Sequence, residues 1–103
     1  MIKVSVLYRN DEGRKFDMGY YCNKHMPMVK QKLGAACKRV DVDEGLGGVQ
    51  PGSRPAFVAM CHLVFDSVEA FQKAFAPHAD AIMGDIPNYT DIQPLIQVNE
   101  IRM

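Results

Sequence analysis

Residues 57–65, Phe-Val-Ala-Met-Cys-His-Leu-Val-Phe, decide the fold because they form the strongest predicted strand of the chain. Side chains alternate between the two faces of a strand, so Phe57 and every second residue after it share one face, and the Val58 set shares the other. Both sets are largely apolar, which predicts a strand covered on both sides. Residues 45–55 precede it and are rich in glycine and proline, which predicts a long hairpin loop.

The chain before this loop has the pattern of a strand, a helix and a weaker strand. Residues 2–8 alternate with the period of a strand, and residues 16–33 carry apolar residues at helical spacing. Pro27 lacks the backbone donor that would bond to the Asn23 carbonyl, so we expect it to kink or split this helix. Residues 36–44 form the weaker strand, which pairs with residues 57–65 through the loop.

The chain after residue 65 predicts a second helix and a last strand. Asp66 as the N-cap, with Glu69 three residues later, has the pattern of a helix start, Pro77 interrupts the helix, and residues 92–101 form the strand. The order strand-helix-strand-strand-helix-strand predicts a ferredoxin-like α+β fold, a four-stranded antiparallel sheet with both helices on one face. The 103 residues fit a single domain over residues 1–103.

The other face of such a sheet has no covering layer within the chain. Because the strand at residues 57–65 is apolar on both sides, that face would expose apolar side chains to water. A second copy of the chain, packed sheet to sheet, removes this exposure, and two-fold dimers are the commonest oligomers. The sequence therefore predicts a homodimer.

Composition and charge exclude several classes of protein. Hydrophobic residues make up 48% and charged residues 23% of the chain, and the net charge is +0, which argues against a nucleic-acid binder or a basic membrane-surface helix. The N-terminus has no leader pattern and no apolar run is long enough to span a bilayer, so we expect a soluble cytoplasmic protein.

The chain has no metal-ligand spacing and no flavin, nicotinamide or phosphate-loop signal, so we expect no cofactor. The three cysteines are widely spaced and are expected to be reduced: Cys22, Cys37 and Cys61.

His25 is the strongest candidate for chemistry. It lies in the middle of the apolar face of the first predicted helix, where a titratable side chain needs a partner. It is either a core histidine bonded to a backbone carbonyl or a residue on the wall of a cavity, able to transfer protons near neutral pH. Tyr21 lies one turn earlier on the same face and could share that cavity, whereas Tyr20 points elsewhere by periodicity and is expected in packing or an interface.

The remaining candidates are placed less firmly by the sequence. His62 faces either the helices or the dimer core, and His78 lies at the rim of the second helix's apolar stripe, at a pocket or at the solvent edge. The loop at residues 85–90 is polar and connects the second helix to the last strand, where it could close a pocket mouth and contact a ligand. Local turn bonds explain its polar residues equally well. The candidate ligand contacts are His62, His78, Asp85, Asn88 and Tyr89.

Several stretches resemble the EthD family over nearly the whole chain. They are Phe16 with Tyr20-Tyr21 and His25-Met26-Pro27, the strand from Pro55 to Met60, Phe65 to Phe71, and Gly84 to Thr90. The family is named for a locus of ethyl tert-butyl ether degradation. The resemblance implies a dimeric α+β barrel, in which two ferredoxin-like units face each other through their sheets.

The resemblance implies a small-molecule pocket without choosing the reaction. Related barrels include cofactor-independent monooxygenases, cyclases and isomerases, and others only bind ligands. Two hypotheses follow. In one, the chain is a cofactor-free enzyme of a degradative or secondary-metabolic pathway, an oxidoreductase, isomerase or cyclase, with His25 as acid and base and Tyr21 as hydrogen-bond partner. In the other, it is a non-catalytic binding or accessory protein of an oxygenase system. Either ligand would be small and largely apolar.

Overall fold

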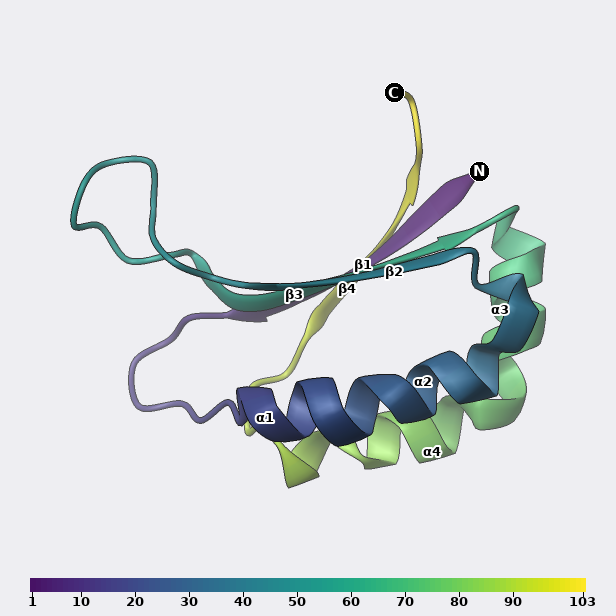
Figure 1. The fold of residues 1–103 in the computed structure, drawn as a ribbon, viewed down its shortest axis with the longest axis horizontal. Helices are drawn as coiled ribbons and strands as arrows, with labels where there is room; N and C mark the ends of the chain where they lie inside the picture. The colour runs from purple at the N-terminus through teal and green to yellow at the C-terminus, as the bar shows by residue number, and fades with distance from the viewer.

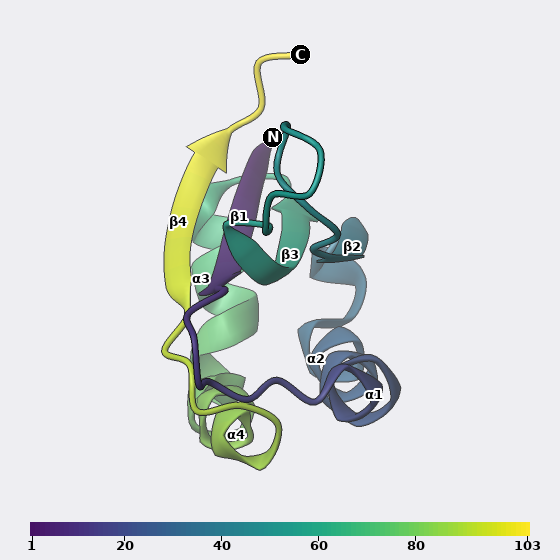
Figure 2. The same ribbon diagram turned by 90° about the vertical axis from the view of Figure 1, so that its left-hand side faces the viewer.

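A computed structural model describes all 103 residues as one sheet with a layer of helices on one face (Figure 1, Figure 2). The strands are β1 (Ile2–Arg9), β2 (Arg39–Glu44), β3 (Phe57–Phe65) and β4 (Leu95–Glu100). The α-helices are α1 (Met18–Tyr20), α2 (Met26–Leu33), α3 (Val68–Phe75) and α4 (Ala79–Gly84). The strands pair antiparallel in the order β2-β3-β1-β4. The ferredoxin-like fold predicted from the sequence is confirmed.

The first helical segment stays continuous at Pro27 and widens just before it. Residues Tyr21–His25 form a π-helical turn between α1 and α2, and the Met26 N–H donates to the Tyr21 carbonyl. A π turn bonds residue i to i+5, so it accommodates a residue that cannot complete the α-helical ladder. The expected disturbance is therefore present as a wide turn, and the helix is not split.

The second helical segment starts one residue later than the sequence predicts. Ser67, in extended conformation, is the N-cap and its hydroxyl accepts from the Ala70 N–H at 3.1 Å. Asp66 lies outside the helix and pairs with Lys38 at 3.8 Å, so its prediction as the cap was wrong. Pro77 lies in a 3-10 turn that joins α3 to α4. Strands β2 and β4 each begin three residues later than predicted.

The core lies between the sheet and the helices, and the strand register decides which face of β3 it uses. Ala59, Cys61 and Phe65 point to the helices and are buried. On β1, which pairs with β3, Val4 and Tyr8 point the same way and are 1% exposed. The Phe57 set therefore packs under the helices, and the Val58 set, with His62, lies on the uncovered face.

The uncovered face is more polar than the sequence analysis predicts. One row joins the apolar residues Met60, Leu7 and Leu95 across β3, β1 and β4, and ends in Asp43 on β2. The next row joins His62 to Ser5 and Gln97. The prediction of an apolar face considered β3 alone, and the register sets polar residues of the neighbouring strands beside it.

The loop between β2 and β3 projects from the body of the molecule (Figure 1). It joins adjacent antiparallel strands, which confirms the predicted hairpin. Leu46 and Val49 in this loop are fully exposed. None of the helices combines the length and the apolar character that a membrane crossing needs.

Candidate functional site

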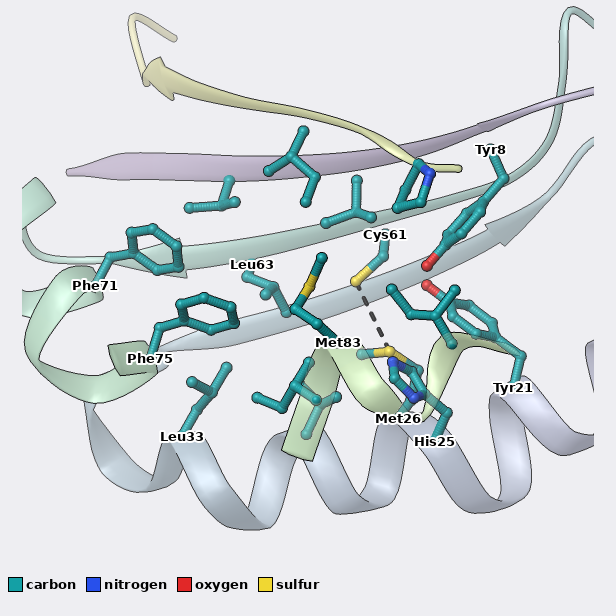
Figure 3. Close-up of a pocket in the computed structure, with 17 residues that line it drawn as sticks. Tyr8, Tyr21, His25, Met26, Leu33, Cys61, Leu63, Phe71, Phe75 and Met83 are labelled. Atoms are coloured by element: carbon teal, nitrogen blue, oxygen red, sulfur yellow. Dashed lines mark hydrogen bonds between the residues drawn. The ribbon is translucent and has the colours of Figure 1, made fainter. Parts of the chain in front are cut away.

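An apolar cavity of about 100 Å³ lies between the helical layer and the sheet (Figure 3). Fifteen of the 17 residues that line it are hydrophobic. They come from β1, β3 and the start of β4 on one side, and from α2, α3, α4 and the π turn on the other. The cavity that the sequence predicts is present, and both His25 and Tyr21 line it.

His25 is 4% exposed and uses both of its ring nitrogens. Its Nδ1 lies 2.9 Å from Oδ2 of Asp85, and its Nε2 lies 3.4 Å from the hydroxyl of Tyr89. An ionised carboxylate only accepts hydrogen bonds, so Nδ1 carries a proton and donates it to Asp85. In the neutral imidazole, Nε2 is then an acceptor. The contact with Asp85 orients the ring and holds a charge beside it.

Asp85 lies at the end of α4 and has three hydrogen-bond donors. Besides His25, Oδ1 accepts from the hydroxyl of Tyr20 at 2.7 Å and from the amide of Asn88 at 2.9 Å. Partial burial raises the pKa of Asp85, but the bonds from Asn88, Tyr20 and His25 outweigh it and hold the pKa below its ordinary value. Asp85 is therefore a carboxylate at neutral pH.

Two tyrosines place hydroxyl groups at the same end of the cavity. Tyr21 stacks on His25 with ring centroids 5.6 Å apart and an angle of 14° between the planes. Tyr8 comes from β1, and Figure 3 shows its hydroxyl and that of Tyr21 pointing into the same space beside Cys61. Burial raises the pKa of Tyr8 to about 12 and raises that of Tyr21 further. Both stay protonated at neutral pH, so each can donate a hydrogen bond to a ligand oxygen.

None of the other predicted contacts lines the cavity. Asp85, Asn88 and Tyr89 do not line it; Asp85 and Tyr89 bond to His25, and Asn88 bonds to Asp85. His62 bonds to Ser5 at 2.8 Å on the uncovered face of the sheet. His78 lies in the turn between α3 and α4 and does not line the cavity either.

Sequence reasoning missed Tyr8 and gave Tyr20 a different place. Tyr8 lies on the helix-facing side of β1, together with Val4 and Val6, and this alternation could have identified it. Tyr20 was expected on another face of the helix because an α-helical period was assumed. The π turn brings residues five apart over one another, so Tyr20 and His25 both reach Asp85.

The side chains offer no metal centre in this structure. No group of three or more histidine, cysteine, aspartate and glutamate side chains is arranged to hold an ion. Cys61 is buried in the cavity wall, and burial raises its pKa to about 12, so it stays a thiol. The titratable groups of the site are therefore His25, Asp85 and the tyrosines.

Comparison with known proteins places this chain by its sequence and its fold. The model of the EthD domain matches residues 10–93. An EthD-like protein from Ralstonia eutropha JMP134 is 52% identical, with a TM-score of 0.92 over 96% of this chain and 89% of that one. An EthD family protein from Bacillus halodurans C-125 is 20% identical, with a TM-score of 0.69 over 99% of both chains, and shares the fold. No curated protein matches. The chain belongs to the EthD family.

Proposed function

We propose that this protein binds a small, largely apolar molecule in the cavity and acts on it without a cofactor. One observation carries the proposal: a buried histidine, oriented by the partly exposed carboxylate of Asp85, lies on the wall of an otherwise apolar cavity. In this arrangement His25 is the acid and base, and Asp85 stabilises the imidazolium that forms when His25 takes up a proton. Tyr21 donates a hydrogen bond to the ligand.

The lining of the cavity limits the ligand to a neutral molecule with few polar atoms. No lysine, arginine, aspartate or glutamate lines the cavity, so an ionised ligand would lack a partner for its charge. A ligand oxygen can accept from the hydroxyl of Tyr21. The volume is below the roughly 150 Å³ of an apolar cavity known to hold benzene. A short ketone fits these limits.

The reaction that suits these groups is removal of a proton from the carbon beside a carbonyl. His25 would take the proton, and the hydrogen bond from Tyr21 would stabilise the enolate oxygen. Loss of such a proton begins isomerisation, cyclisation and carbanion oxygenation. The proposed enzyme would therefore be an isomerase, a cyclase or an oxidoreductase of a degradative or secondary-metabolic pathway.

The hydrogen bonds that His25 already makes favour a second function. Both of its ring nitrogens already have partners within the protein, as in a histidine that only holds a core together. In that case the protein is a non-catalytic binding protein or an accessory component of an oxygenase system, and the cavity only carries the ligand.

Hydrogen–deuterium exchange of 2-butanone separates the two functions. Proton NMR in D₂O follows the loss of its α-hydrogens, and chemical-shift changes of the protein report binding. For an enzyme, we expect the wild type to accelerate exchange and His25→Gln to abolish it while still binding butanone. Binding without exchange in the wild type would support the carrier. Absence of both would contradict this ligand class.

We also propose that the protein is a homodimer joined through the uncovered face of the sheet. The row of Met60, Leu7 and Leu95 on that face supports this, because a partner would remove these side chains from water. The resemblance to dimeric barrels supports the same arrangement.

A further inference from the structure

Four side chains form a continuous path of hydrogen bonds from the protein surface to the cavity. Asp85 is partly exposed at the outer end and bonds to His25 at 2.9 Å. The other nitrogen of His25 lies 3.4 Å from the hydroxyl of Tyr89, which lies 2.6 Å from the hydroxyl of Tyr8. The partners in these three contacts are 60, 64 and 81 residues apart in the chain, so only the tertiary structure assembles the path.

The chemistry of the outer end fixes the direction of every bond. Asp85 only accepts, so Nδ1 of His25 donates and Nε2 accepts. The single hydroxyl proton of Tyr89 then goes to Nε2. Because Tyr89 has no second proton to give, the proton in the 2.6 Å contact belongs to Tyr8. The hydrogen bonds from Tyr8 through Tyr89 and His25 to Asp85 therefore all donate in the same direction, as the transfer of protons along the path requires.

The inner end of this path is Tyr8. Both nitrogens of His25 are occupied, and Tyr89 does not line the cavity. Tyr8 does line it, and Figure 3 shows its hydroxyl pointing into the space beside Tyr21 and Cys61. A phenol oxygen that donates to Tyr89 keeps its lone pairs for a further contact. The oxygen of Tyr8 can therefore receive a proton from a ligand in the cavity.

We propose that Tyr8 is the catalytic residue that exchanges a proton with the ligand, and that Tyr89 relays this proton to His25. The inference rests on the proposed function and names the atom through which His25 acts. The ligand C–H proton moves to the Tyr8 oxygen, the Tyr8 proton moves to Tyr89, and the Tyr89 proton moves to Nε2 of His25. The C–H electron pair becomes the enolate, and the imidazolium remains beside the Asp85 carboxylate. No oxidant or reductant is needed.

The same butanone exchange assay tests the relay with single hydroxyl deletions. Tyr8→Phe and Tyr89→Phe should each lower the exchange rate at saturating butanone by about a hundredfold, a typical contribution of a positioned acid or base. Butanone affinity should change little. Tyr21→Phe is the matched contrast, because it removes a cavity hydroxyl outside the relay and should weaken butanone affinity as well. Wild-type exchange in Tyr8→Phe, with none in His25→Gln, would overturn the relay and leave the proposed function standing.

Nitrogen-15 NMR of the histidine ring gives a second readout that needs no ligand. The relay requires that neutral His25 carries its proton on Nδ1 and that Nε2 accepts from Tyr89. The Nε2 signal should therefore shift in Tyr89→Phe, while Nδ1 stays bonded to Asp85. A wild-type protein with the proton on Nε2 would overturn the relay whatever the exchange assay shows. If the wild type does not exchange butanone, the proposed function fails and Tyr8 is not a catalytic residue; the tautomer then tests only the direction of the hydrogen bonds along the path.

Discussion

Filling the cavity by one methylene group should stabilise the protein and weaken ligand binding. Val29, on α2, lines the cavity and is 4% exposed. An apolar cavity of about 100 Å³ corresponds, at roughly 24 cal/mol per Å³, to a loss of about 2.4 kcal/mol in the free energy of unfolding. Val29→Ile adds one methylene, for which burial contributes about 0.8 kcal/mol. We expect the free energy of unfolding to rise by about that amount, because the added group enters existing space.

Urea unfolding followed by circular dichroism measures this change, and NMR titration with butanone measures the loss of affinity. Ala59→Val is the control: Ala59 faces the helices, is fully buried and does not line the cavity. There the added methyl groups have no space, and overpacking should cost about 1–3 kcal/mol. If Val29→Ile destabilises the protein as much as Ala59→Val, or leaves butanone affinity unchanged, the cavity is not the open, ligand-sized space that we describe.

Three further predictions concern the site and the assembly. The lowered pKa of Asp85 stabilises the fold above its ordinary pKa of 3.8, and this stabilisation is lost as the pH falls through the folded value. Asp85→Asn should therefore be less stable than the wild type at pH 6, and the difference should shrink below about pH 4; an equal gap at both pH values would show that the hydrogen bonds from Asn88, Tyr20 and His25 do not stabilise the ionised carboxylate. Pro27→Ala restores a backbone donor, so we expect the π turn to become α-helical and butanone affinity to fall with little change in Tm, whereas unaltered affinity would show that Pro27 is only tolerated. Sedimentation at micromolar concentration should give a dimer, and Leu7→Lys on the uncovered face should shift it to monomer with the cavity intact; a wild-type monomer would refute the sheet-to-sheet assembly.

Local patterns in the sequence determined the elements and their order. Hydrophobic periodicity depends only on neighbours along the chain, so it gave four strands, two helical segments and the hairpin at residues 45–55. It also singled out His25, because a titratable residue in an apolar helical stripe is visible without any partner. Because both predicted helices lie on one face of the predicted sheet, the sequence also indicated that the other face has no covering layer within the chain.

Only the tertiary structure decided how these pieces meet. The face of β3 that packs under the helices depends on its pairing with β1, since a shift of one residue would exchange the Phe57 and Val58 sets. The same pairing placed His62 on the uncovered face. Asp85 reaches His25 across 60 residues, and Tyr8 reaches Tyr89 across 81. Such contacts depend on the packing of separate elements, which periodicity does not encode, and the relay to the cavity consists entirely of them.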